Sequence, residues 1–370
     1  MMPGARRRWI ANAMGACALN ALGIRPGVAR EDQSTPYPDV RPRPLAFPRD
    51  HGAHLTYRTE WWYITGWLGE GDQSMGFQVT FFRSRTRHPD QNPSRFAPRQ
   101  LLFAHVALAV PSVGKLLHAD RAARSGAGLM GVSEHDTNIQ MADWRLIRQR
   151  QAAGEVYSAE IMNADFGLRF TASTRLPPVL RGDFGVSRKG PLPTLASFYY
   201  SRPQLDVQAV VKIAGREQSL RGAAWLDHEW SSSLLMDGAS GWDWIGIHLF
   251  DGTSLMAFRI RDARGQTLWR HVDWRDIHGK VIRQSYRDGD WRPIRQWRSP
   301  RSLIEYPVGI VLHLFGENYE LMPLMADQEV DARASTGGFY WEGAVTLMRA
   351  GKPLGRGYLE LTGYGDRLVL

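Results

Sequence analysis

The chain has 370 residues, of which 43% are hydrophobic and 22% are charged, with a formal net charge of +9 and one cysteine, Cys17. These proportions are those of a globular protein of about two domains, so they exclude disorder and a membrane-embedded body, and a single cysteine excludes an intrachain disulfide. The positive charge comes from scattered arginines without a nucleic-acid-binding motif, so nucleic acid is not an expected partner.

The amino terminus has the pattern of an export signal. Three arginines, Arg6 to Arg8, precede a mildly apolar stretch that ends near Ile24, and small residues suited to cleavage follow. The order resembles a twin-arginine signal, so we expect residues 1–30 to direct the protein to the periplasm or outside the cell. A lipoprotein anchored at Cys17 is the alternative. No later run of 18 apolar residues predicts a transmembrane helix.

The rest of the chain alternates short apolar runs with turn residues. Residues 31–46 hold four of five closely spaced prolines and predict an extended lead-in. After it the spacing predicts strands and almost no helix, with residues 115–123 as the best helical candidate. The expected strands cover 60–68, 75–83, 101–110, 157–162, 168–173, 208–213, 242–250, 254–260, 310–314, 340–348 and 356–362.

An internal repeat organises these strands. An ungapped shift of 181 positions superposes Trp61 on Trp242, Tyr63 on Trp244 and Phe77 on Phe258. Two similar barrels explain the repeat, and we expect an N-terminal domain over 47–222 and a C-terminal domain over 223–370. A chance alignment of two amphipathic aromatic hairpins is the other explanation.

Several motifs give the chain a family resemblance. They are Phe47 to His54 (FPRDHGAH), Arg58 to Gly66 (RTEWWYITG), Trp225 to Trp230 (WLDHEW), Gly241 to Trp244 (GWDW), Tyr340 to Val345 (YWEGAV) and Gly357 to Tyr364 (GYLELTGY). Together they resemble the family named for AttH and carotenoid 1,2-hydratase, and RTEWWY resembles its AttH branch. The resemblance implies an all-β fold of two lipocalin-like (calycin) antiparallel barrels in tandem. It also implies either an enzyme or a protein associated with an ABC exporter.

Hydration of an unactivated double bond sets chemical requirements that one segment can meet. The reaction needs an acid that protonates carbon, a wall that tolerates a cation, and a positioned water. Burial or a neighbouring carboxylate can keep a carboxylic acid protonated near neutral pH. We therefore expect Asp227 to act as the acid, with His228 and Glu229 beside it. As alternatives, Asp-His pairs at strand entries cap turns.

Aromatic rings and a second Asp-His pair complete the predicted site. The residues expected to contact the ligand are Trp225, Trp230, Trp242, Trp244, Asp50, His51, Trp61 and Tyr63. A metal site built from Asp50, His51, His54 and His228 is a weaker alternative, because histidines in glycine-bounded turns more often form hydrogen bonds. No metal and no cofactor are expected.

Three functions remain open from the sequence. The first is a carrier of an apolar isoprenoid, polyene or lipid, alongside an ABC exporter. The second is a carotenoid 1,2-hydratase-like hydro-lyase, and the third is an envelope scaffold with filled barrels and no ligand. A pocket of several hundred cubic ångströms beside Asp227 would favour the enzyme, and a pocket without buried acids would favour the carrier.

Overall fold

A computed structural model describes residues 36–365 except 90, 95, 126–127, 234 and 285–290, and the side chain of Gln284. The expected export signal, Cys17 and the first part of the proline-rich lead-in lie outside the described residues. None of the described helices is long and apolar enough to cross a membrane.

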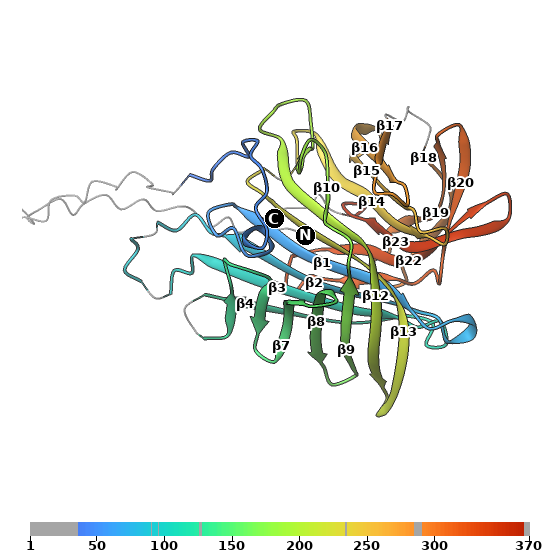
Figure 1. Cartoon of the computed structure of the whole chain (residues 1–370), viewed down its shortest axis with the longest axis horizontal. Coiled ribbons are helices and arrows are strands. Elements are labelled where there is room, and N and C mark those ends of the chain that lie inside the picture. The colour runs from blue at the N-terminus through green and yellow to red at the C-terminus, as the bar shows by residue number, and fades with distance from the viewer. Residues whose placement is uncertain are drawn as a thin grey trace, which may run out of the picture. The chain divides into compact units, whose positions relative to one another are not determined.

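The described chain is built almost entirely from strands. Its helices are two short 3-10 turns, η1 (Arg49–His51) and η2 (Gly71–Gln73). Figure 1 follows the chain from the blue β1 through the yellow-green β13 and into the orange and red strands. All strand pairs are antiparallel within two sheets, which confirms the predicted all-β fold and fits two lipocalin-like barrels in tandem.

The first sheet runs from β1 to β13. Its strands are β1 (Thr59–Leu68), β2 (Met75–Arg85), β3 (Gln100–Ala109), β4 (Leu116–Arg124), β5 (Met130–Val132), β6 (Asn138–Met141), β7 (Trp144–Gln151), β8 (Gly154–Met162), β9 (Phe166–Thr174), β10 (Val179–Leu180), β11 (Val186–Arg188), β12 (Ala196–Ile213) and β13 (Arg216–Ser231). An ion pair between Arg121 on β4 and Asp143, before β7, links the two ends of this sheet, so the barrel is nearly closed.

The second sheet runs from β14 to β23. Its strands are β14 (Ala239–Leu249), β15 (Ser254–Asp262), β16 (Thr267–Arg275), β17 (Val281–Gln284), β18 (Trp291–Arg298), β19 (Glu305–Leu314), β20 (Glu317–Pro323), β21 (Glu329–Asp331), β22 (Phe339–Arg349) and β23 (Lys352–Leu361). The last strand of the first sheet, β13, ends at Ser231, and the second sheet begins at Ala239. The expected domain boundary at 222/223 therefore falls inside β13.

The two sheets repeat one topology. The first has the order β4-β3-β2-β1-β13-β12-β9-β8-β7, and the second has β17-β16-β15-β14-β23-β22-β20-β19-β18. In each, the first strand lies between the second and the last strand of its own half. Thus β1 corresponds to β14, β13 to β23 and β12 to β22, which supports the repeat seen in the sequence.

The register corrects one part of that repeat. Tyr63 pairs with Thr80 in the first sheet, whereas the corresponding Trp244 pairs with Phe258 in the second. The residue equivalent to Phe258 is therefore Thr80, and the predicted match with Phe77 is wrong by three positions. An odd shift reverses the face of a strand. Phe77 accordingly packs inside the first barrel, while Phe258 belongs to the cluster between the sheets.

Two further expectations about local structure differ from what is observed. Residues 115–123 form most of β4 rather than a helix, because this segment pairs along its whole length with β3. The strand expected at 208–213 is the second half of β12, which begins at Ala196. Pro203 interrupts the sequence pattern there, and the strand accommodates it with a bulge between Arg202 and Leu205, where no ladder hydrogen bond is needed.

Three hydrophobic clusters fill the protein. The first occupies the first barrel, around Trp62, Phe77 and Leu226, and the second occupies the other barrel, around Ile245, Trp341 and Leu359. The third lies between the sheets, where β1, β12 and β13 face β14, β15, β22 and β23. Both barrel interiors are thus packed with side chains, and the sheets meet through a separate aromatic layer.

Candidate functional site

A cavity of about 170 Å³ lies within this aromatic layer between the sheets. Strands β1, β2, β12 and β13 form one wall, and β14, β15, β22 and β23 form the other. An apolar void of about 150 Å³ holds one benzene molecule, so the closed part of this cavity has room for about one ring. Its aromatic lining consists of Trp61, Tyr63, Phe82, Tyr199, Trp242, Trp244, Phe258 and Tyr340.

Asp227 lines the cavity from β13, and its carboxyl group accepts three hydrogen bonds. Tyr199 donates its hydroxyl to Oδ2 (2.7 Å), Ser201 donates to Oδ1, and the Trp225 indole donates to Oδ1 (2.8 Å). Burial raises the pKa of Asp227 to about 6, while the charge of Arg181 and the three donors limit that rise. Near neutral pH this carboxyl group is therefore mainly ionised.

Arg181 supports Asp227 from behind. Its buried guanidinium donates from Nε to the Ser201 hydroxyl (2.8 Å) and lies 5.1 Å from the centre of the Trp225 indole. It thus contacts two of the three groups that donate to Asp227. Arg181 also lies 3.6 Å from the buried carboxylate of Asp273, which belongs to the second sheet.

The opposite wall carries two carboxyl groups with different surroundings. Glu342 on β22 and Glu360 on β23 are directly paired across the two strands. Glu342 is buried, its Oε2 accepts a hydrogen bond from the Gln78 amide (2.5 Å), and its Oε1 has no partner among the described residues. Burial, followed by the charge of Glu360, raises the pKa of Glu342 well above the ordinary value.

Glu360 has a less extreme environment. It is only partly buried against the cavity, and the Trp242 indole donates to its Oε2 (3.0 Å). Burial raises the pKa of Glu360 to about 7, although the Trp242 hydrogen bond opposes the rise. The second-sheet wall therefore favours the protonated form of Glu342, and near neutral pH it holds Glu360 in both states.

The two walls are related by the repeat. Asp227 pairs with Tyr63 on β1, and Glu360 pairs with Trp244 on β14, so these two carboxyl groups occupy equivalent positions. The cross-strand neighbour of Asp227 is Ser201, whereas that of Glu360 is Glu342. A hydroxyl donor beside Asp227 favours its carboxylate, and Glu360 has no hydroxyl donor at the corresponding position. Burial raises the pKa of both groups, to about 6 for Asp227 and about 7 for Glu360, so the two equivalent positions differ modestly in protonation near neutral pH.

A charged pair completes the cavity lining. Lys189 places its ammonium nitrogen 2.9 Å from Glu229 Oε1, and Ser197 also donates to this carboxylate. The same nitrogen lies 4.2 Å from the centre of the Phe258 ring and 5.0 Å from that of Tyr199. The cavity therefore contains a cation held by one carboxylate and two aromatic rings.

The structure divides the predicted site residues between two places. The cavity contains Asp227, Glu229, Trp61, Tyr63, Trp242 and Trp244. Trp225 lies under the cavity wall and reaches it only through its bond to Asp227. His228, Trp230, Asp50 and His51 instead point into the first barrel or its end. Strand alternation separates them, because residues 227 and 229 face one side of β13 and residues 228 and 230 face the other.

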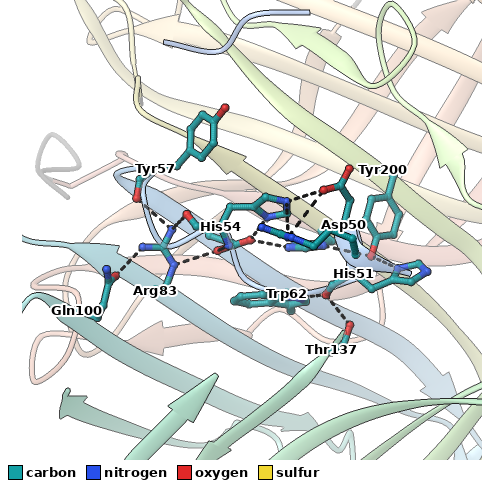
Figure 2. Close-up of polar contacts among 12 residues, drawn as sticks. Asp50, His51, His54, Tyr57, Trp62, Arg83, Gln100, Thr137 and Tyr200 are labelled. Atoms are coloured by element: carbon teal, nitrogen blue, oxygen red, sulfur yellow. Dashed lines mark hydrogen bonds and ion pairs between the residues drawn. The ribbon is translucent and has the colours of Figure 1, made fainter. Parts of the chain in front are cut away.

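The residues of the first-barrel end form a buried polar network (Figure 2). His54 lies between two carboxyl groups, with Nδ1 2.7 Å from Glu60 Oε1 and Nε2 3.0 Å from Asp50 Oδ1. Arg43 and Arg83 bind the other oxygens of Asp50 and Glu60. Burial alone would raise the pKa of both carboxyl groups, but these partners hold both below their ordinary values.

The other histidine of the FPRDHGAH motif, His51, lies at the edge of this network. His51 Nδ1 is 2.7 Å from the Tyr200 hydroxyl, and its backbone carbonyl accepts from Thr137. Burial, with the nearby Arg148, lowers the pKa of His51, so its ring is neutral. The FPRDHGAH segment is thus held ahead of β1 by hydrogen bonds of Asp50, His51 and His54.

Three side chains of the network meet a geometric criterion for a metal site. His54, Glu60 and His228 are buried, and each offers a ligand atom within 4.8 Å of the other two. Each oxygen of Glu60 already accepts two hydrogen bonds, from His54 and His228 on one side and from the His54 amide and Arg83 on the other. A metal ion would have to replace these contacts, and we assign the network a structural role.

The comparisons with known proteins agree with the fold. The AttH-like family profile matches residues 38–364. The chain belongs to the AttH-like family. It is similar to the crystal structure of a candidate AttH from Nitrosomonas europaea, with 44% identity over 88% of this chain and 99% of that one, at a TM-score of 0.80.

A second solved structure shares the AttH-like fold at low identity. Kievitone hydratase from Nectria haematococca is 14% identical over 88% of this chain and 94% of its own, with a TM-score of 0.62. This likeness concerns the fold alone. No curated protein sequence matches the chain. The family resemblance inferred from the motifs is confirmed, and the chemistry has to be argued from the cavity.

Several residues of the site were not among those predicted from the sequence. Glu342, Glu360, Tyr199, Gln78 and Lys189 line the cavity, and Ser201 lies behind it and donates to Asp227. A signal for the first two was present, because both glutamates lie on neighbouring terminal strands at positions that can share a face. Lys189 lies in a loop after β11, where no periodicity indicates its direction.

Proposed function

We propose that this AttH-like protein binds a small, mainly apolar molecule between its two sheets and adds water across a carbon–carbon double bond of it. The observation that carries this proposal is the placement of two carboxyl groups in unlike surroundings across one aromatic cavity, because Asp227 accepts three hydrogen bonds and Glu342 has a buried oxygen without a partner among the described residues. Groups with environments that separate their pKa values in this way are the usual acid and base of an active site.

The roles follow from the hydrogen bonds. Glu342 is the acid, because it lines the cavity, its buried Oε1 has no hydrogen-bond partner among the described residues, and burial favours its protonated form. Asp227 is the base, because three donors favour its carboxylate. The sequence alone suggested Asp227 as the acid, and the donor set now favours the opposite role.

The proposed reaction needs no cofactor. Glu342 transfers its proton to one alkene carbon, which leaves a cation on the other carbon. Water attacks that carbon and loses a proton to Asp227, and solvent then returns the proton from Asp227 to Glu342. The aromatic lining stabilises the cation by roughly 1 to 2 kcal/mol for each desolvated ring that faces it.

The carrier remains the second candidate, because one observation favours it. The cavity is closer to one ring in volume than to the several hundred cubic ångströms expected for the enzyme. A longer ligand would then project beyond the closed part of the cavity, and binding without turnover would suffice. Filled barrel interiors alone would suit the scaffold, but a cavity with four lining carboxyl groups does not.

Isotope incorporation separates turnover from binding. The protein is incubated with neutral trisubstituted alkenes of the isoprenoid type in heavy-oxygen water or deuterium oxide, and products are analysed by mass spectrometry. We expect label in the product from the wild type and none from Glu342→Gln or Asp227→Asn. The matched controls are Glu320→Gln and Asp206→Asn, which alter exposed carboxyl groups outside the cavity. Bound but unlabelled alkene would support the carrier.

Location and partners are separate proposals. We infer from residues 1–30 that the protein acts in the periplasm or outside the cell, and from the family resemblance that an ABC exporter is a partner. The first proposal is tested by fractionating cells of the native host that produce either the unaltered protein or the Arg6→Lys, Arg7→Lys variant. We expect the unaltered protein in the periplasmic or extracellular fraction and the variant inside the cell. Affinity capture from membranes tests the second.

A further inference from the structure

One positively charged side chain of the protein already lies in the cavity. The Lys189 ammonium group is held by Glu229 at 2.9 Å and by the faces of Phe258 and Tyr199. Lys189 is mostly buried, so these contacts take place largely away from water. The wall of this cavity therefore offers the combination of carboxylate and aromatic rings that binds organic cations.

A second carboxylate in the same cavity has no such cation. Asp227 faces the cavity two residues before Glu229, and in the part of the chain that the structure describes no lysine or arginine forms an ion pair with it. Arg181 lies behind it and donates to Ser201 rather than to the carboxylate. Oδ2 accepts one hydrogen bond, from Tyr199, which leaves it able to accept another.

The aromatic rings near this carboxylate come from both sheets. Trp61 and Tyr63 line the cavity from β1, and Trp242 and Trp244 line it from the equivalent positions on β14. The Trp244 indole donates to the Tyr199 hydroxyl (3.1 Å), which in turn donates to Asp227. The repeat thus places a pair of indoles and a carboxylate around one small volume.

The charges that face this volume have one prevailing sign. Four carboxyl groups line the cavity, from Asp227, Glu229, Glu342 and Glu360, against the single ammonium of Lys189, and even with Glu342 protonated and Glu360 partly ionised the negative charges outnumber the positive one. His105 also lines it, and burial lowers the pKa of its ring to about 4, so it adds no positive charge near neutral pH. An anionic ligand would meet repulsion without a free cation to pair with.

We propose that the cavity selects ligands that carry, or acquire during reaction, a positive charge beside Asp227, and that it rejects carboxylates and phosphates of the same size. This inference rests on the proposed function, because the charge acquired during reaction is that of the alkene-derived cation. The ligand is therefore an organic ammonium ion if it only binds, or a neutral alkene if it is the substrate.

Three probes of one ring size test the inference by isothermal titration calorimetry. They are benzyltrimethylammonium, benzyl alcohol and benzoate, which differ chiefly in the charge of the substituent. We expect the ammonium ion to bind at least about tenfold more tightly than the alcohol, because one or two desolvated cation–π contacts supply a free energy of that size. Benzoate should show no measurable binding. Asp227→Asn should remove most of the preference for ammonium, and Asp206→Asn should leave it intact.

A second variant keeps the test independent of Asp227. Trp242→Leu keeps an apolar but smaller side chain and removes the indole face, and we expect it to weaken ammonium binding several-fold more than alcohol binding. Benzoate binding as tightly as ammonium would overturn the inference. If benzyl alcohol bound as tightly as benzyltrimethylammonium, the inference would also be overturned. The proposed hydration of a neutral alkene would not be contradicted by that result. Absence of binding by all three probes would contradict both proposals.

Discussion

The buried carboxyl group of Asp227 should destabilise the protein at neutral pH, and Asp227→Asn measures that effect. The folded-state pKa is about 6, against an ordinary value of 3.8. Because folding raises the pKa of an acid, the unfolded chain loses its proton first as the pH rises. Stability is therefore fully retained below about pH 3.8, falls between the two values, and stays low above about pH 6.

The size of the effect follows from the same two values. A difference of about two pKa units corresponds to ~3 kcal/mol, at about 1.4 kcal/mol per unit. Asparagine never ionises but cannot accept all three hydrogen bonds from Tyr199, Ser201 and Trp225, which costs about 1–2 kcal/mol at every pH. The variant should thus be about 1–2 kcal/mol more stable than the wild type near pH 8 and less stable near pH 4.

Urea unfolding of both proteins at several pH values provides the assay. The quantity of interest is the change with pH of the difference in unfolding free energy, with Asp206→Asn as a control at an exposed position on β12. A pH-independent difference would show that Asp227 does not titrate between these values. If the wild type instead gained stability relative to the variant as the pH rose, the three donors would outweigh burial and the reasoning would be refuted.

Three other substitutions test separate parts of the structure. Arg181→Gln removes the positive charge behind Asp227 and should raise the pKa of that carboxyl group above about 6, as read by carbon-13 NMR titration, with Arg181→Lys intermediate. Gly246→Ala places a Cβ 2.5 Å from the Trp244 ring, so it should cost about 1–3 kcal/mol in thermal unfolding and weaken benzyl alcohol binding. Glu60→Gln leaves a buried arginine without its ion pair and should lower stability by about 3–5 kcal/mol, unlike an exposed glutamate variant.

The sequence predicted the strands whose apolar pattern is clear. The segments at 60–68, 75–83 and 340–348 became β1, β2 and β22 with ends displaced by at most two residues. It missed β7 and β18, because their alternating arginines and glutamines resemble surface loops. Such strands are held by pairing with their neighbours, which a single sequence does not show.

The repeat and the site show a second limit. Thr80 follows its partner Tyr63 by 80 − 63 = 17 residues, whereas Phe258 follows its partner Trp244 by 258 − 244 = 14, so an ungapped shift fits β1 but is three residues out of register on β2 and reverses its face. The WLDHEW motif was singled out for its chemistry, but its segment was not among the expected strands, and in β13 alternation sends His228 into the barrel and Asp227 into the cavity. Which face meets the second sheet is decided by packing between distant strands, and local sequence does not contain that information.

The proposed function depends most directly on the unlike protonation states of Glu342 and Asp227. Carbon-13 NMR of side-chain carboxyl groups, with Glu342→Gln and Asp227→Asn to assign the signals, measures both states in the intact protein near pH 7.5. We predict a protonated Glu342 and an ionised Asp227, as burial on one side and three donors on the other require. Two ionised groups, or two protonated ones, would leave the cavity without an acid and a base and would contradict the proposed function.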